Sequence, residues 1–121
     1  MLTLSKQECI AQIKKQACFQ ASVADGAFTI KVEEYSPMIC AAIHNGNRLR
    51  KELEKNFLLN DTERLYEEDP YTEDLISSFP IVLTANDSRF EYDLNRPKTL
   101  STYFKTAWDK QVWSKPLTQK Q

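Results

Sequence analysis

The sequence of 121 residues is poor in several residue types on which common sites depend. It has one histidine, His44, and two glycines, Gly26 and Gly46. One histidine excludes a site built from two histidines of this chain, such as a Cys2His2 finger, and two glycines exclude a glycine-rich phosphate-binding loop. The sequence has three cysteines, and no two of them are spaced as a CxxC motif. An odd set does not form a disulfide framework, so we expect reduced thiols in a cytoplasmic protein.

Long apolar runs and an excess of one charge are also missing. No stretch approaches ~18 uninterrupted apolar residues, so we expect no membrane-spanning helix. Residues 1–15 carry charges among their apolar positions, unlike a signal peptide. The 16 Lys and Arg residues balance 17 Asp and Glu residues, whereas dedicated nucleic-acid binders are usually strongly basic. We therefore expect neither a membrane nor a nucleic acid as a partner.

The amino-terminal part of the sequence predicts a helix followed by a β-hairpin. Ser5 and Glu8 have the spacing of a capping box, and apolar residues then recur at helical spacing to about Cys18. From Phe19 to Val32 apolar and polar residues alternate, with Asp25-Gly26 in the middle. Asp-Gly between two alternating runs is favoured turn chemistry for a hairpin.

The rest of the sequence predicts strands separated by helices. Short apolar runs at Met38–Ile43 and Ile81–Ala85 indicate buried strands, and alternation over Arg89–Leu94 predicts a third core strand. Helices are expected over 49–59, over 70–79 with Asp69 as its cap, and over 102–113. This order is typical of an α/β protein with a mixed central sheet and flanking helices. We expect one domain over residues 1–121, with a flexible tail over 115–121.

Two polar segments follow or precede these predicted elements. His44 comes directly after an apolar run, and ligands in α/β proteins gather where strands end in loops. It is therefore a candidate metal ligand or acid–base group, with an ordinary exposed loop histidine as the alternative. The acidic cluster Glu67-Glu68-Asp69 suits a cation. Alternatively, it complements the amino terminus of the helix predicted after it.

The segment from Ser88 to Arg96 is the most informative part of the sequence about a possible binding site. On a strand, Arg89, Asp93 and Asn95 would share one face. The Arg96 guanidinium, beside an amide, suits a two-pronged grip on a carboxylate. The alternative is a structural lattice of arginine and aspartate. Residues 103–115 interleave aromatic and basic residues, and aromatic side chains in such a stretch can stack on nucleic-acid bases. An amphipathic helix whose aromatic side chains face the core is the simpler interpretation.

Together, the segments Ile43–Arg48, Glu67–Thr72 and Ser88–Arg96 resemble the N-formylglutamate amidohydrolase family, whose members look like relatives of the zinc carboxypeptidases. The resemblance runs from about Ile39 to Pro97, and Asp-Leu-Asn-Arg is its most specific part. It implies a zinc-exopeptidase-like fold. It also implies a metal-dependent hydrolase that cleaves N-formyl or N-acyl amino acids, releasing formate or another acid and the amino acid.

The resemblance also implies roles for individual residues. His44 matches the first zinc-binding histidine, and Glu68 is the best match for the acidic zinc ligand, ahead of Asp69 and Glu67. Arg89 matches a catalytic position that polarises the scissile carbonyl.

Two further matches concern the substrate, a small molecule that bears a carboxylate. Asn95 and Arg96 match positions that hold this carboxylate, and Asp93 would orient them. If the match holds, the His44 imidazole and the Arg96 guanidinium should lie within about 12 Å, the span of a small ligand pocket.

The sequence departs from the family pattern in its metal ligands. A catalytic zinc normally has three protein ligands, and no histidine follows His44. Asp109 is the only acidic residue after Arg96, so no convincing general base appears there. We therefore expect either the amino-terminal part of a longer enzyme or a short relative that lost the chemistry. In both cases zinc should be weakly held or absent in this chain, which should be inactive by itself.

A truncated chain would have an incomplete sheet, and self-association through an exposed sheet edge would then follow. The alternative to the hydrolase is a non-catalytic, metal-free module that binds a small carboxylate or a protein partner through Arg89 and Arg96.

Overall fold

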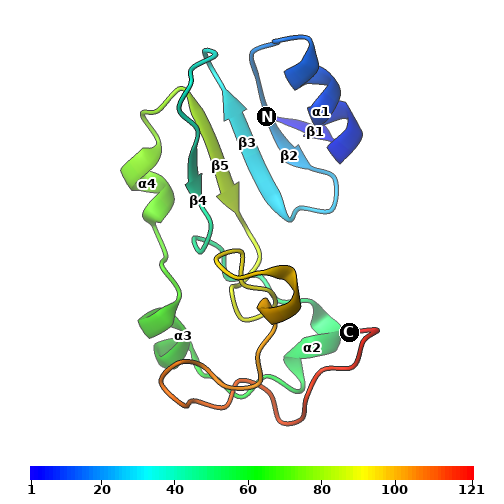
Figure 1. The fold of residues 1–121 in the computed structure, drawn as a ribbon, viewed down its shortest axis with the longest axis vertical. Coiled ribbons are helices and arrows are strands. Elements are labelled where there is room, and N and C mark those ends of the chain that lie inside the picture. The colour runs from blue at the N-terminus through cyan, green and yellow to red at the C-terminus, as the bar shows by residue number, and fades with distance from the viewer.

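The computed structural model describes all 121 residues. An open five-stranded mixed sheet of order β1-β2-β3-β5-β4 forms one part of the molecule, with a helix beside each edge. Further short helices and long loops lie beyond one end of the strands (Figure 1). The predicted α/β class with a mixed sheet is therefore confirmed. The strands are β1 (Leu2–Leu4), β2 (Phe19–Val23), β3 (Phe28–Val32), β4 (Cys40–Ala42) and β5 (Ile81–Ala85).

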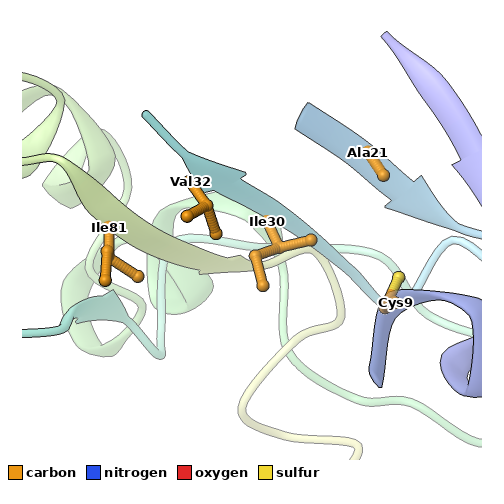
Figure 2. Packing of buried hydrophobic residues seen from close by; sticks show 5 residues of the cluster. All are labelled: Cys9, Ala21, Ile30, Val32 and Ile81. Carbon is orange, nitrogen blue, oxygen red and sulfur yellow. The ribbon is translucent and has the colours of Figure 1, made fainter. Parts of the chain in front are cut away.

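The amino-terminal helix and the hairpin form as the sequence predicts. α1 (Lys6–Lys14) begins after Ser5, and Ser5 and Glu8 make both hydrogen bonds of a capping box. β2 and β3 pair in antiparallel register across a turn in which Gly26 has a φ of 76°. Cys9 on α1 packs against apolar side chains of the sheet, which form the first core cluster (Figure 2). Its buried members are Cys9, Ala21, Ile30, Val32 and Ile81.

The two remaining strands are parallel to each other. β5 lies between β3 and β4, as expected for the buried run Ile81–Ala85. The run Met38–Ile43 is a strand only over Cys40–Ala42, and Met38 and Ile39 are 54% and 63% exposed. β4 lies at the edge of the sheet and pairs with β5 only through these three residues. Met38 and Ile39, which precede β4, therefore have no neighbouring strand to cover them.

The prediction of a third core strand over Arg89–Leu94 is wrong, because this segment forms turns. Ser88 Oγ accepts a hydrogen bond from the Phe90 N–H, and the Asp93 carboxylate accepts one from the Asn95 N–H. Such side-chain bonds to nearby backbone compete with the ladder of a sheet. Phe90, Glu91 and Asp93 are all buried, so the alternation in sequence does not become alternation in space.

The prediction of a helix over 102–113 is also wrong. Lys105 and Gln111 form an isolated antiparallel bridge, and the chain reverses between them. Asp109 has a φ of 60°, and Thr106 Oγ accepts hydrogen bonds from the backbone N–H groups of Trp108 and Lys110. These contacts stabilise a tight reversal instead of a helix.

The other helices are shorter than predicted or were not predicted. The range 49–59 contains only α2 (Lys51–Glu54). The range 70–79 contains α4 (Thr72–Ile76), which follows Tyr71 in a left-handed conformation and is not capped by Asp69. α3 (Asp61–Glu67) begins after Asn60, which forms a capping box with Glu63, and η1 (Lys98–Leu100) is a turn of 3-10 helix. None of the helices has the length and apolar character needed to cross a membrane.

A second core cluster lies outside the sheet. Its buried members are Leu53, Leu59, Phe90, Val112 and Trp113. The carboxy-terminal segment therefore packs against α2 and the turn that contains Phe90. Leu117 packs against the same cluster, and the carbonyl of Gln121 accepts a hydrogen bond from Arg50. The flexibility of residues 115–121 stays a prediction.

Candidate functional site

The loops that follow β4 and β5 run side by side. Because the two strands are parallel, both loops leave the same end of the sheet. Arg48 bridges to Asp87, and its N–H donates to the carbonyl of Asn86. Gly46 permits this approach, because a Cβ at this position would lie 2.1 Å from the carbonyl carbon of Asn86. The fold therefore brings the loop containing His44 to the segment that follows β5.

The His44 side chain lies buried between two aspartates. Its Nε2 is 2.7 Å from Asp93 Oδ1, and its Nδ1 is 3.4 Å from Asp69 Oδ2. The Asp69 N–H also donates to the carbonyl of His44. An ionised carboxylate only accepts hydrogen bonds, so Nε2 must carry the hydrogen that is shared with Asp93. In a neutral imidazole the lone pair of Nδ1 then faces the Asp69 carboxylate.

The Asp93 carboxylate connects the parts of the site. It is fully buried and accepts hydrogen bonds from His44 Nε2, from the Asn95 N–H at 2.9 Å and from Arg89 Nη2 at 3.0 Å. The Tyr103 hydroxyl is a fourth donor, at 3.1 Å. Burial raises the pKa of Asp93, but the hydrogen bonds from Asn95, His44 and Arg89 outweigh it and lower the pKa to about 2.

This lowered pKa predicts a loss of stability in acid. The reference pKa of an aspartate is 3.8, so the ionised form stabilises the folded state above about pH 4 and this contribution is lost as the pH falls toward 2. We expect the loss to be about 2 kcal/mol of the free energy of unfolding. Urea unfolding at pH 5.5 and pH 2.5 measures it. The Asp93→Asn variant should lack this part of the pH dependence, and equal pH dependence in both proteins would contradict the assignment.

Arg96 also reaches the Asp93 carboxylate. Its Nε is 3.6 Å from Asp93 Oδ2, and its guanidinium lies 5.1 Å from the centre of the Tyr103 ring. His44 and Arg96 thus contact one carboxylate, which brings them within the separation expected of a shared site. The Asn95 side chain is exposed and makes no hydrogen bond, and its backbone N–H alone takes part in the site.

Arg89 is fixed by two hydrogen bonds. Its Nη1 donates to the carbonyl oxygen of Glu67 at 2.8 Å, and its Nη2 donates to Asp93. Burial by itself lowers the pKa of Arg89, but hydrogen bonds and charge interactions with Tyr103 and Asp93 outweigh it, so the pKa is raised. The guanidinium is therefore a permanent positive charge that joins the acidic segment to Asp93.

Glu68 and Asp69 point to different parts of the site. Glu68 Oε1 accepts hydrogen bonds from Ser88 Oγ at 2.5 Å and from Arg64 Nη2 at 3.0 Å. Asp69 is the carboxylate that contacts His44. Glu68 as a metal ligand stays a prediction, and its hydrogen-bond partners are Ser88 and Arg64. Sequence reasoning missed Tyr103, which lies in the segment that was expected to be a helix.

The pair formed by His44 and Asp69 fits two ligands of a zinc ion. Nitrogen and oxygen donors at about 2.0–2.2 Å from a tetrahedral zinc are about 3.4 Å apart, which is the observed distance between Nδ1 and Oδ2. A ligating histidine usually donates its other N–H to a carboxylate, as His44 does to Asp93. No group of three His, Cys, Asp or Glu side chains in the chain is arranged to hold a metal ion.

The model of the N-formylglutamate amidohydrolase family matches residues 36–121. No curated protein and no solved structure shows significant similarity to the chain. The matched range begins before β4 and includes His44, Asp69 and the segment from Ser88 to Arg96, so it contains every residue of the site described above. It also covers well over half of the sequence, and the chain therefore belongs to the N-formylglutamate amidohydrolase family.

Proposed function

We propose that this site serves the metal-dependent hydrolysis of the amide bond in N-formyl or other N-acyl amino acids. Family membership supports hydrolysis of an amide. The observation that carries the metal is the placement of His44, with one ring nitrogen on Asp93 and the other facing Asp69 at 3.4 Å. Two donors in such an arrangement favour a shared cation.

In this proposal His44 Nδ1 and Asp69 Oδ2 hold the metal. Zinc, when bound, lowers the pKa of a water ligand to ~7 and polarises a carbonyl group. Asp93 keeps the hydrogen of His44 on Nε2, so the lone pair of Nδ1 is free for a ligand bond. With two protein donors the remaining positions are open to water, so this chain should hold zinc weakly.

The two arginines bind and orient the substrate in this proposal. Arg96 is 44% exposed in its side chain and offers its terminal nitrogens to the carboxylate of an amino acid. Arg89 is held by Glu67 and Asp93 in a fixed orientation. Such a fixed cation stabilises the oxyanion that develops when the amide carbonyl is attacked.

A zinc titration tests the metal pair. We expect calorimetry to show weak zinc binding to the 121-residue chain, which His44→Ala abolishes. Asp69→Asn should weaken it by about tenfold or more, as expected when a charged ligand is lost. Glu68→Gln is the matched control, because it keeps an oxygen that accepts from Ser88 and Arg64, and it should change the affinity by less than about twofold. A larger effect at Glu68 than at Asp69, or zinc binding that survives in His44→Ala, would contradict the assignment.

A metal-free module that binds carboxylates is the second candidate. It is favoured by the lack of a third metal ligand beside His44 and Asp69. This function needs Arg96 but not His44. It therefore predicts that an N-acyl amino acid binds equally well to the wild type and to His44→Ala, and that zinc has no effect on the binding of this ligand.

A further inference from the structure

Four hydrogen-bond donors surround the Asp93 carboxylate, two on each oxygen. They are His44 Nε2 and the Asn95 N–H on Oδ1, and Arg89 Nη2 and the Tyr103 hydroxyl on Oδ2. A carboxylate oxygen has two lone pairs, so these donors occupy every acceptor position of Asp93. Arg96 Nε lies 3.6 Å from Oδ2, which is close enough for attraction between charges and too far for a hydrogen bond.

The Arg96 guanidinium lies on an aromatic ring instead. It is 5.1 Å from the centre of the Tyr103 ring, a distance typical of a cation–π contact. The Arg96 side chain is 44% exposed, and Arg96, Tyr103 and Arg89 line one cavity of about 320 Å³. Tyr103 therefore has two contacts that bear on Arg96. Its ring lies against the guanidinium, and its hydroxyl occupies the acceptor position of Asp93 that is nearest to Arg96 Nε.

The Tyr103 hydroxyl keeps its hydrogen at neutral pH. Burial raises the pKa of Tyr103, and the nearby charge of Asp93 raises it further, although Arg89 opposes this change. Without this hydroxyl, Oδ2 of Asp93 would have a free lone pair, with Arg96 Nε only 3.6 Å away. A hydrogen bond between a guanidinium and a carboxylate is strong because both partners are charged. We therefore expect Arg96 to close onto Asp93 when the hydroxyl is absent.

From these observations we propose that Tyr103 is a positioning residue that keeps Arg96 off Asp93 and thereby available to the carboxylate of a ligand. The proposal rests on the proposed function, in which Arg96 binds the substrate carboxylate. A guanidinium binds a carboxylate through two parallel N–H groups. If Arg96 turned onto Asp93, it would direct N–H groups and positive charge to an internal partner. Tyr103 thus acts on the ligand through Arg96.

Tyr103→Phe tests the hydroxyl alone, because phenylalanine keeps the ring beside Arg96. N-formyl-L-glutamate is titrated into the metal-free 121-residue chain and followed by NMR. We expect Tyr103→Phe to bind this ligand about tenfold more weakly than the wild type, since the ligand must displace one charge-assisted hydrogen bond between Arg96 and Asp93. In the Arg96→Ala background, the same substitution should change the affinity by less than about twofold, because the hydroxyl acts through Arg96.

A second measurement follows Arg96 in the protein without ligand. The Arg96 Nε–H signal is identified by its absence in Arg96→Lys. Its hydrogen should exchange with water more slowly in Tyr103→Phe than in the wild type, because it becomes bound to Asp93. A hydroxyl that only stabilises the fold would change the free energy of unfolding and would leave both the ligand affinity and this exchange rate unchanged.

Tyr92→Phe is the matched control. The Tyr92 hydroxyl donates to Asp87 Oδ2 at 2.5 Å, so this variant also removes a partly buried hydrogen bond between a tyrosine and an aspartate. Tyr92 and Asp87 line a different cavity, which does not include Arg96. Tyr92→Phe should therefore change the affinity for N-formyl-L-glutamate by less than about twofold and leave the Arg96 Nε–H exchange unchanged.

The outcomes separate the inference from the proposed function. If the wild type binds N-formyl-L-glutamate and Tyr103→Phe binds it equally well, the inference is wrong and the carboxylate site of the proposed function stands. Equal exchange of the Arg96 Nε–H in these two proteins would also overturn the inference. If the wild type does not bind the ligand, both the inference and the proposed carboxylate site are wrong.

Discussion

Replacing Asp93 with alanine should lower the free energy of unfolding by about 3–5 kcal/mol, the range seen when one partner of a buried charge pair is removed. The carboxylate is fully buried and accepts hydrogen bonds from His44, Arg89 and Tyr103 and from the Asn95 N–H. Alanine would leave these donors without the carboxylate that accepts their hydrogen bonds. Urea unfolding at pH 7 measures the change.

Asp93→Asn is the control for shape at this position. Asparagine keeps one acceptor oxygen, but its amide NH2 group would face a donor. The free energy of unfolding of Asp93→Asn should therefore lie between that of the wild type and that of Asp93→Ala. A loss below about 1 kcal/mol in Asp93→Ala would mean that the donors find water or new partners, and would contradict the central role of this carboxylate.

Replacing Phe90 with alanine should have an effect of similar size. The Phe90 ring is 0% exposed and lies 5.8 Å from the Phe57 ring in the second core cluster. Removing a buried phenylalanine ring leaves a cavity and usually reduces the free energy of unfolding by about 3–5 kcal/mol. Because Phe90 lies three residues before Asp93, the variant should also disturb the turn that holds the site.

Phe79→Ala is the comparison for Phe90, since Phe79 is 36% exposed and lies outside both core clusters. We expect Phe79→Ala to lower the free energy of unfolding by less than about half as much as Phe90→Ala, because only part of the Phe79 side chain is buried. Equal losses in urea unfolding would contradict the placement of Phe90 in a well-packed core.

Local patterns in the sequence were sufficient where local interactions determine the structure. The capping box at Ser5 and the Asp-Gly turn at Gly26 produce α1 and the hairpin as predicted. The segment 89–94 also alternates, but Ser88 and Asp93 bind nearby backbone groups and fold it into turns. Alternation of side chains does not reveal that competition.

The site was predictable in position and less so in detail. His44 and Arg96 come together because their loops leave neighbouring parallel strands. The choice within Glu67-Glu68-Asp69 depends on where α3 ends. Glu68 is the carboxy-terminal cap with extended backbone (φ −71°, ψ 143°), so the chain changes direction there and Asp69 reaches His44. Composition and spacing do not specify such a change of direction.

The most direct test of the account is the state of the His44 ring. His44 is the only histidine in the sequence, so its two ring nitrogens give the only imidazole ¹⁵N signals of the protein. We predict that Nε2 carries the hydrogen at neutral pH, and that added zinc shifts the Nδ1 signal while the Nε2–H stays bound to Asp93. A hydrogen on Nδ1 that persists at saturating zinc, or a zinc-induced change at Nε2 in place of Nδ1, would contradict the assignment of His44 and Asp69 as the metal pair.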